Sequence, residues 1–563
     1  MISQSVRTQI NRLCARYPRK ESALMPALSL MQRENENVLT RAQIRAVAKA
    51  VGVSAAKAFG VATFYTMYNV GGTIGKYHLQ VDTNIPATLM GGLEILAHLE
   101  KILGIKAGES TADGLFTLTA VECLGSCGTC PVIQVNDVYY ENMTFARTDE
   151  LIASLRKGVM PRADPTSFFY TEPGILLKNR GQPSIAPHDY AALDKALGMA
   201  PDVVRAEVTK SLLRGRGGAG FPAGTKWGFL TQDATRPVYL VCNADEGEPG
   251  TFKDRQIMQY DPHLLIEGIA IAAHAIGART AFIYIRGEFG FIADVLEKAI
   301  ARAPVKHIDI VVHRGAGSYV CGDETALMES IEGKRGNPRP KPPFPANIGL
   351  YGCPTIINNV ETLSCLPYIV THGADAFKKI GTVGNSGPKI YSVSGQVNKP
   401  GAFEFPMGVT LDKVLAAAGG VKGTLKAVIV GGLSVPILTA QEAKGLVLDY
   451  ASCVKAGTLL GSGGIMVMND TVSIPQVALR TIAFYAHESC GQCVPCREGS
   501  NLIKNRLSAL VKGTGTHKDI DLILKICAGV KGLTLCPLGE AFAMPVEAMV
   551  KKFRPEFEAL VKF

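Results

Sequence analysis

The sequence predicts a multidomain protein of the α/β class. The chain has 563 residues, far more than one hydrophobic core accommodates, so three to five domains are expected. Near the N-terminus, apolar residues such as Leu24, Leu28 and Met31 recur at helical intervals. Later segments alternate as short strands, and the region from about residue 475 onward is again helical.

Composition and charge exclude several classes of protein. Basic side chains number 59 and acidic ones 49, but the excess is spread along the chain and does not predict a nucleic-acid-binding surface. The most apolar window, residues 264–285, is interrupted by Glu267, His274 and Arg279, so we expect no direct membrane insertion. Fourteen cysteines without an N-terminal secretion pattern predict a reducing, cytoplasmic location and metal chemistry in place of disulfides.

Four cysteines near the C-terminus predict a metal centre. Cys490, Cys493 and Cys496 have the spacing C-x2-C-x2-C, and Cys536 follows at a distance along the chain. Four thiolates are the ligand set of a [4Fe–4S] cluster. Zinc also binds four thiolates, but usually through two separated C-x2-C pairs. The spacing therefore favours a [4Fe–4S] cluster over zinc or a site without metal.

A second group of cysteines lies in an N-terminal α/β region. Helices are expected up to about residue 75, and three short strands are expected after them. Cys123, Cys127 and Cys130 lie between the second and third of these strands. Helices that lead into a small sheet with paired thiols predict a thioredoxin-like domain.

Three stretches of this domain resemble the small [2Fe–2S] subunit of the NADH-oxidising arm of respiratory complex I: residues 60–65, 81–91 and 122–131. That family binds its cluster with two cysteine pairs, and Cys123 and Cys127 match the second pair. Asp82 and Ala87 stand where the first pair is expected, and alanine cannot bind iron. A [2Fe–2S] cluster needs four ligands, so we expect this cluster to be absent or defective. In the alternative without metal, the fold is retained for docking and its cysteines are small buried hydrophobic residues.

The largest block of sequence carries four loops that suit a nucleotide. Residues 213–227 form a glycine-rich loop whose backbone N–H groups can approach an anion, and Lys226 adds a positive charge. The acidic loop 243–254 follows an apolar strand, and its carboxylates suit sugar or ribityl hydroxyls. A second acidic loop follows at residues 315–325. Residues 338–345 then form a stiff turn that carries a lysine and a phenylalanine. Each segment alone is more often an ordinary turn, but four in one α/β domain predict a cofactor site.

With residues 355–362, these loops resemble the flavin- and NADH-binding subunit of the same NADH dehydrogenase arm, over about residues 175–563. The resemblance implies a Rossmann-like domain that binds FMN and NAD(H). FMN would be held by Gly215, Gly217, Gly218, Lys226, Asn243, Asp245 and Asn358. The nicotinamide cofactor would have its adenine between Phe221, Phe229 and Phe344, and its riboses and pyrophosphate against Glu248, Tyr319, Glu324 and Lys341. The same motifs add Arg216, Glu246, Gly322, Asp323 and Asn359 to the cofactor-binding set.

One position departs from that family. Two glutamates usually stand where this chain has Asp323 and Glu324. The shorter aspartate keeps the negative charge, so we expect it to retune the flavin site without abolishing it. Carboxylates such as Glu248 and Glu324 beside the ribose would disfavour a 2′-phosphate, which predicts NAD(H) over NADP(H).

The expected domain organisation has four parts, with a proline-containing linker at about residues 151–175. The β-grasp part is implied by the resemblance, and we expect it to act as a structural spacer. The predicted domains are a thioredoxin-like [2Fe–2S]-type domain with incomplete ligands (1–160), an FMN- and NADH-binding domain (175–385), a ubiquitin-like β-grasp domain of the soluble-ligand-binding type (386–465) and a helical [4Fe–4S] domain (466–563).

These features predict a diaphorase subunit of a soluble multisubunit redox complex, which transfers electrons between NAD(H) and iron–sulfur clusters through FMN. No general acid or base is assigned, because the flavin carries the hydride transfer. The expected partners are other iron–sulfur or catalytic subunits. The fusion of two subunit types resembles the diaphorase subunits of NAD-linked formate dehydrogenases and NAD-reducing hydrogenases. The alternatives are a respiratory complex I subunit and a catalytically silent scaffold.

Overall fold

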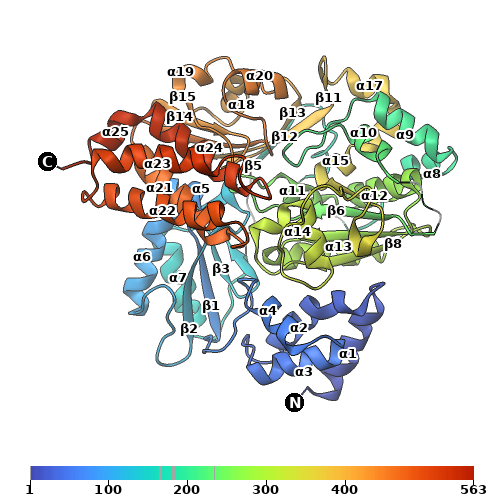
Figure 1. The fold of residues 1–563 in the computed structure, drawn as a ribbon, viewed down its shortest axis with the longest axis horizontal. Helices are drawn as coiled ribbons and strands as arrows, with labels where there is room; N and C mark the ends of the chain where they lie inside the picture. The colour runs from blue at the N-terminus through green and yellow to red at the C-terminus, as the bar shows by residue number, and fades with distance from the viewer. Residues whose placement is uncertain (1, 164–167, 181–184, 232, 234, 563) are drawn as a thin grey trace.

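The computed structural model describes residues 2–163, 168–180, 185–231, 233 and 235–562. Figure 1 shows a parallel sheet with its helices on one side of the molecule and a helical bundle on the other. A third sheet lies above them in this view, and the thioredoxin-like sheet and the N-terminal helices lie below. In the part of the chain so described, no helix is both long and apolar enough to cross a bilayer.

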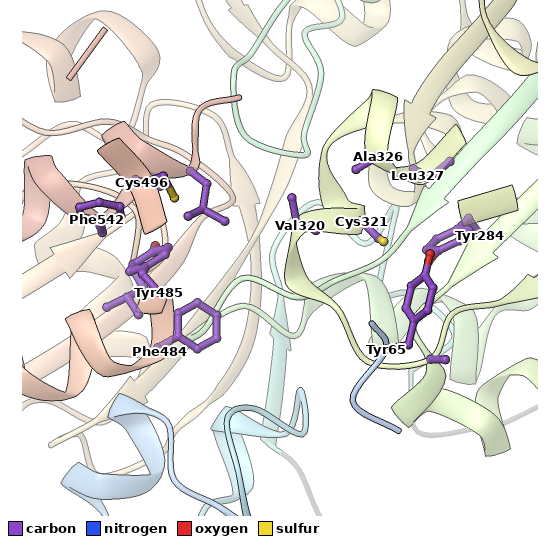
Figure 2. Packing of buried hydrophobic residues seen from close by; sticks show 14 of the residues in the cluster. Tyr65, Tyr284, Val320, Cys321, Ala326, Leu327, Phe484, Tyr485, Cys496 and Phe542 are labelled. Carbon is purple, nitrogen blue, oxygen red and sulfur yellow. The ribbon is translucent and has the colours of Figure 1, made fainter. Parts of the chain in front are cut away.

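Four helices open the chain: α1 (Gln4–Ala15), α2 (Leu24–Arg33), α3 (Arg41–Val51) and α4 (Ala55–Ala62). Thr40 and Gln43 form a capping box at the start of α3. The apolar faces of these helices join the core of the nucleotide domain, where the Tyr17 hydroxyl lies 3.0 Å from His313 Nδ1. Figure 2 shows Tyr65, just after α4, beside Tyr284 of the parallel sheet. The N-terminal helices therefore share their core with the nucleotide domain, whereas the sheet that follows them has a core of its own.

The thioredoxin-like prediction is confirmed by a four-stranded sheet with the order β2-β1-β3-β4. Strands β1 and β2 are parallel, and the other neighbours are antiparallel. The sheet has its own core, to which helices α6 and α7 contribute. Its elements are β1 (Tyr77–Asp82), α5 (Ile85–Leu89), α6 (Gly92–Leu103), β2 (Phe116–Val121), β3 (Ile133–Val135), β4 (Val138–Tyr140) and α7 (Phe145–Arg156).

The Rossmann-like prediction is confirmed by an all-parallel sheet with the order β8-β7-β6-β9. Helix α12 is buried on almost every side, which explains why most of its residues are apolar. The strands are β6 (Tyr239–Ala244), β7 (Thr280–Ile285), β8 (Asp309–Arg314) and β9 (Thr355–Asn359). The helices are α8 (Ala191–Leu197), α9 (Pro201–Lys210), α10 (Ala223–Gly228), α11 (Lys253–Tyr260), α12 (Pro262–Ile276), α13 (Gly290–Ile300), α14 (Glu324–Ile331), α15 (Val360–Ser364), α16 (Leu366–His372) and α17 (Ala374–Lys378).

A six-stranded sheet with the order β15-β14-β16-β12-β13-β5 forms the third unit. It includes β5 (Phe168–Thr171), which lies in the predicted linker and pairs in parallel with β13. The linker prediction is therefore wrong for this stretch, because Glu404 of β13 accepts hydrogen bonds from the N–H groups of residues 175–177. Residues 164–167 of that linker lie outside the described part. The other elements are β12 (Pro388–Gly395), β13 (Gly401–Pro406), α18 (Leu411–Ala417), β14 (Leu425–Val430), β15 (Leu438–Thr439), α19 (Ala440–Ala443), α20 (Tyr450–Lys455) and β16 (Gly464–Asn469).

The C-terminal region is a bundle of helices, as predicted. Strand β16 runs past the predicted boundary at residue 465, so the bundle begins only after Asn469. The cysteine-bearing loops lie between α21 and α22 and just before α24. The helices are α21 (Ile474–Glu488), α22 (Val494–Val511), α23 (His517–Val530), α24 (Leu538–Lys552) and α25 (Arg554–Glu558).

A buried group of charges joins the nucleotide domain to the third sheet. Glu361, at the start of α15, is fully buried, and one of its oxygens lies 2.9 Å from Lys253 Nζ and 3.7 Å from Lys389 Nζ. Its other oxygen accepts a hydrogen bond from the backbone N–H of Ile390. Buried charges require partners, because transfer out of water is unfavourable. Burial lowers the pKa of Lys389 to about 8. Glu361 therefore holds two lysines that belong to two different units.

We predict that Glu361→Gln destabilises the protein by about 3–5 kcal/mol, because it leaves buried lysines without their carboxylate. Urea unfolding followed by fluorescence measures this loss, since Trp227 is the single tryptophan and is buried in α10 of this domain. Glu442→Gln serves as the control, because it removes an exposed pair with Lys552 and should change stability by less than about 1 kcal/mol. Equal losses in the two variants would contradict the structural role of Glu361.

Candidate cofactor and iron–sulfur sites

The glycine-rich loop before α10 is closed by contacts at both of its ends. Gly215 donates its N–H to the carbonyl of Phe221 at 2.9 Å. Tyr450, from the third sheet unit, donates its hydroxyl to the carbonyl of Gly215. Gly218 has a φ of 154°, and a Cβ placed there would meet nothing within 4 Å. The loop therefore leaves open space beside Gly218 where an anion has room, as a phosphate-binding loop requires.

The polar residues that follow the parallel strands meet at one edge of the sheet. Asn243, near the end of β6, donates its amide to the carbonyl of Gly322 at 2.9 Å. Asn358, near the end of β9, accepts a hydrogen bond from the Trp227 indole at 2.8 Å. Ligands bind at the carboxyl ends of the strands in open parallel sheets. The structure thus brings four of the predicted segments together at the position expected for a nucleotide.

Asp245 supplies a test of whether this edge fits a bound group. The residue is half-buried, but its Oδ2 is shielded from solvent and has no hydrogen-bond partner in the described structure. Burial raises the pKa of Asp245 to about 8. A buried carboxyl without a partner is unfavourable unless another group completes its hydrogen bonds. Asp245 therefore fits a bound polar cofactor, to which it can offer a carboxyl proton or a carboxylate oxygen.

Glu324 connects two lysines beside this edge. Its oxygens lie 3.0 Å from Lys226 Nζ and 2.9 Å from Lys341 Nζ. Burial opposes the charged form, but the two lysines outweigh it and lower the pKa of Glu324 below its ordinary value. Asp323 accepts the N–H groups of residues 325 and 326 and caps helix α14. The shorter side chain of Asp323 is therefore used as a helix cap.

Glu248 lies between the nucleotide domain and the third sheet unit. Its Oε2 accepts the Tyr319 hydroxyl at 2.5 Å, and its Oε1 accepts the Ser434 N–H at 2.7 Å. The Tyr319 N–H in turn donates to Glu488, at the end of α21, at 2.8 Å. Burial raises the pKa of Glu248 above its ordinary value and that of Glu488 to about 7. Three units therefore meet at Tyr319.

Three predicted cofactor residues have structural partners that the sequence did not reveal. Both oxygens of Glu246 accept backbone N–H groups at the start of α11. Asn359 caps α15 and donates its amide to Asp254 at 2.6 Å. Arg216 is fully buried and donates to the carbonyl of Ser386, while its Nε and Nη1 have no partner in the described structure. Two of these side chains are thus engaged as caps, and Arg216 retains donors for a further group.

The three predicted aromatic residues are all exposed. Phe221 is 47% exposed, Phe229 57% and Phe344 55%. The rings of Phe221 and Phe229 lie 6.0 Å apart between their centroids. Phe344 belongs to the segment that also carries Lys341. Exposed aromatic faces beside a polar site are suited to stacking on a flat ring.

Sequence reasoning missed Ser434, Tyr450 and Glu488. Ser434 and Tyr450 belong to the unit that was expected to act as a spacer, and Glu488 belongs to the helical bundle. No local pattern marks the first two, since serine and tyrosine are common at turns and helix starts. Glu488 could have been suspected from its position two residues before Cys490. The third sheet unit therefore contributes directly to the walls of the site.

The four C-terminal cysteines face one small space. Cys490, Cys493, Cys496 and Cys536 line it together with Ser489, Thr534 and Leu538. Among the described residues, no set of three or more potential ligands is arranged to hold a single metal ion. A zinc ion would draw the sulfurs to about 2.3 Å from one point, whereas each iron of a [4Fe–4S] cluster takes its own thiolate. The four thiols that line this one space match the number of ligands that a [4Fe–4S] cluster takes.

The protein environment acts on these thiols in two ways. Burial raises the pKa of Cys536 to about 12 and raises that of Cys496. The Leu535 N–H lies 3.3 Å from Cys493 Sγ, a hydrogen bond that stabilises a thiolate. Figure 2 shows Cys496 beside Tyr485 and Phe542 of the bundle core. Metal binding must therefore overcome burial to deprotonate these ligands.

The cysteines of the thioredoxin-like domain have a different environment. The Asn84 amide lies 3.1 Å from Cys123 Sγ and 3.2 Å from Cys127 Sγ. Asp82 is buried, and its oxygens accept the N–H groups of Asn84 and Leu124. A hydrogen bond from the Cys127 thiol lowers the pKa of Cys123 and raises that of Cys127.

This donor set does not match a [2Fe–2S] cluster. Ala87, at one expected ligand position, is buried in helix α5 and offers no ligand atom. Asp82, at the other, is engaged by backbone donors. The amide of Asn84 lies against both remaining thiols. The two cysteine pairs of the family are therefore only half retained, because Cys123 and Cys127 match the second pair while Asp82 and Ala87 stand at the first.

Four family descriptions match this chain in succession. Residues 10–156 match the thioredoxin-like [2Fe-2S] ferredoxin family, and residues 208–368 match the Nuo51 FMN-binding domain. Residues 389–466 match the SLBB domain, and residues 476–560 match the NADH-ubiquinone oxidoreductase-F iron–sulfur binding region. The first match concerns the fold of the domain, whereas its ligand positions differ as described above.

Characterised proteins are similar to this chain over most of their own length. The second F-type subunit of the NADH-quinone oxidoreductase of Rhizobium meliloti (strain 1021) is 48% identical over 389 residues, which are 66% of this chain and 92% of that protein. The F-type subunit of the same enzyme from Rickettsia bellii (strain OSU 85-389) is 48% identical over 372 residues, 63% of this chain and 89% of that protein. A solved chain of an NAD+-reducing [NiFe]-hydrogenase has a TM-score of 0.87 and 32% identity, covering 95% of this chain and 93% of its own. The chain therefore belongs to the family of F-type subunits of NADH-quinone oxidoreductase, an oxidoreductase family, and carries a thioredoxin-like domain ahead of the shared region.

Proposed function

We propose that this protein is the diaphorase subunit of a multisubunit redox complex and transfers electrons between NAD(H) and iron–sulfur clusters through FMN. The observation that carries this proposal is the hydrogen bond from Tyr319 to Glu488. Tyr319 belongs to the wall of the nucleotide site, and Glu488 directly precedes the loop with Cys490. One contact therefore joins a hydride-accepting site to a site for one-electron transfer.

The residues that would hold FMN are those of the glycine-rich loop and the sheet edge. Gly215, Gly217, Gly218 and Lys226 would bind its phosphate, and Asn243, Asp245 and Asn358 would bind its polar ring or ribityl atoms. Bound FMN supplies the chemistry that links a two-electron donor to one-electron carriers. The protein's own residues orient the cofactors and exclude water from between them. The open space at Gly218 and the unpartnered Asp245 oxygen support this assignment.

The nicotinamide cofactor would lie on the outer side of this site. Tyr319 orients the Glu248 carboxylate, and Lys226 and Lys341 orient that of Glu324. These carboxylates would accept hydrogen bonds from ribose hydroxyls, and Lys341 would offset the pyrophosphate charge. Phe221, Phe229 and Phe344 would stack on the adenine. Gly322 and Asp323 would shape the loop between the two cofactors.

We also propose that residues 1–160 carry no [2Fe–2S] cluster, on the strength of the contacts of Asn84 and Ala87 described above.

The remaining units would correspond to the predicted domains at 175–385, 386–465 and 466–563, with their boundaries shifted by strands β5 and β16. The complex would lie in the cytoplasm, as fourteen cysteines, several of them at ligand spacings, predict. The likeness over 95% of the chain to a chain of an NAD+-reducing hydrogenase supports a multisubunit redox complex. The partners would be the iron–sulfur and catalytic subunits of that complex.

A subunit of a respiratory NADH-quinone oxidoreductase is the second candidate. The identity of 48% to the F-type subunits of that enzyme supports it. Those relatives cover only about two thirds of this chain, whereas the hydrogenase likeness also includes the thioredoxin-like domain. Identification of the subunits that copurify with this chain separates the two candidates.

Anaerobic addition of NADH to the purified, cofactor-loaded protein tests the proposed function. We expect the visible absorbance of the flavin to bleach, because the hydride is transferred to FMN. Flavin released by denaturation, measured by its fluorescence, checks the loading. A loaded protein that does not bleach, or a native preparation without flavin, would instead support the silent scaffold.

We predict that NADPH bleaches the flavin far more slowly than NADH does. The negative charges of Glu248 and Glu324 would repel a 2′-phosphate. The comparison of kcat/KM for the two nucleotides with the same protein measures the preference. Comparable values would show that these carboxylates do not face the ribose.

We predict that Cys536→Ala removes the iron and acid-labile sulfide of the helical domain but leaves bleaching by NADH intact. The change deletes one of four thiolate ligands, while the nucleotide site lies in another domain. Iron and sulfide per chain are measured by colorimetric assay. Cys527→Ala is the matched control, because Cys527 is a buried cysteine of α23 that does not line the four-cysteine space. Full iron content in Cys536→Ala would contradict the proposed ligand set.

We predict that Asp245→Asn retains FMN and Asp245→Leu loses most of it. Asparagine keeps a neutral polar group, as expected for a carboxyl whose pKa burial raises to about 8, whereas leucine offers no hydrogen bond. The loss of one hydrogen bond in a buried site corresponds to about 1–3 kcal/mol, or roughly 5- to 150-fold in affinity. Equilibrium dialysis with FMN measures this difference. Equal affinities of the two variants would place Asp245 away from the cofactor.

A further inference from the structure

The pair of Cys123 and Cys127 stands without a role once the cluster is set aside. The two thiols share one hydrogen-bond donor, the Asn84 amide, at 3.1 and 3.2 Å. Cys130, the third cysteine of the loop, is held apart by a different contact, from its Sγ to the Ser126 carbonyl at 3.6 Å. The loop therefore presents one close pair and one separate thiol.

The two paired thiols differ in their access to solvent. Cys123 is 6% exposed and lines a cavity of about 990 Å³ between the N-terminal helices, the thioredoxin-like sheet and the nucleotide domain. Cys127 is fully buried and accepts the Gly250 N–H at 3.4 Å. A thiol that borders a cavity, next to a second thiol with no exposed surface, is the arrangement of a dithiol that forms a disulfide through a mixed intermediate.

The loop is packed tightly against the nucleotide domain. A Cβ at Gly125 would lie 2.5 Å from the ring of Phe289, and one at Gly128 would lie 2.7 Å from the ring of Phe252. Arg286 donates to the carbonyls of both Cys123 and Glu246. The loop thus contacts the segment 245–252, which carries Asp245 and Glu248. A change in the oxidation state of Cys123 or Cys127 would therefore take place next to the proposed cofactor site.

We propose that Cys123 and Cys127 form a thiol–disulfide exchange site that reacts with small-molecule disulfides entering through this cavity. The Cys123 thiolate attacks the small disulfide, forms a mixed disulfide and releases one small thiolate. The Cys127 sulfur then attacks Cys123 Sγ, forms the internal disulfide and releases the second small thiolate. Two protein thiols are oxidised, two small thiols are produced, and the two protons pass to the thiolates or to solvent.

The proposal makes a specific prediction for the three thiols of this loop. The full-length, cofactor-loaded protein is incubated anaerobically with glutathione disulfide, acid-quenched, alkylated and digested with trypsin. Cys123, Cys127 and Cys130 fall in the peptide 107–147, and the three close cluster cysteines fall in the separate peptide 481–497. We expect the peptide 107–147 to carry one alkyl group, on Cys130, and to have lost two hydrogen atoms. Dithiothreitol should restore three alkylated thiols.

Two variants identify the order of attack. Cys127→Ala should retain glutathione on Cys123, because no second thiol resolves the mixed disulfide. Cys130→Ala is the matched control and should form the internal disulfide as the unmodified protein does. If Cys127→Ala does not fold, the alkylation pattern of the peptide 107–147 from the unmodified protein tests the proposal by itself.

Several results would overturn the proposal. They are three alkylated thiols after incubation, a disulfide that includes Cys130, or a glutathione adduct that persists in the unmodified protein. Iron beyond one [4Fe–4S] cluster, with Cys123 and Cys127 protected until a chelator is added, would also overturn it, because the pair would then bind a metal. The bleaching assay with NADH is scored separately, so failure of the diaphorase proposal does not affect this test.

Discussion

Two hydrogen bonds of Tyr319 hold three parts of this protein in one arrangement. Its hydroxyl donates to Glu248, and its backbone N–H donates to Glu488 of the helical bundle. Glu248 in turn accepts the Ser434 N–H of the third sheet unit. These groups are only half-buried, and a shift of any one unit would separate a donor from its acceptor. The relative position of the nucleotide site and the four-cysteine loop depends on this set of contacts.

Buried charges also hold the nucleotide domain against the third sheet unit. Glu361 binds Lys253 of the nucleotide domain and Lys389 of the third sheet unit. Such pairs contribute little net stability compared with apolar packing, but they are strongly destabilising when one partner is lost. They therefore favour one docking geometry over others. The third sheet unit contacts the nucleotide domain at several places, and it is more than a spacer, since Tyr450 and Ser434 reach the site.

The thioredoxin-like domain keeps its fold although two of its expected ligand positions hold other residues. Its sheet, its helices and its contact with the nucleotide domain are complete, while two of the expected ligand positions hold Asp82 and Ala87. Asn84 satisfies the two remaining thiols with its amide. The loop is still packed against Phe252 and Phe289, so its geometry is maintained by the neighbouring domain. This tight packing keeps Cys123 and Cys127 beside the same Asn84 amide.

The sequence alone determined the domain classes, the four-cysteine ligand set and the glycine-rich loop, because each depends on local spacing or on periodicity. It also predicted that Asp82 and Ala87 break the ligand pattern. Only the tertiary structure decided which polar residues line the site. Glu246, Asp323 and Asn359 cap helices, and Ser434, Tyr450 and Glu488 approach from other units. The same structure separated the N-terminal helices from the thioredoxin-like sheet and placed strand β5 in the predicted linker. A hydrogen bond between residues far apart along the chain is not marked by any periodic pattern in the sequence, because it depends on how whole units pack together.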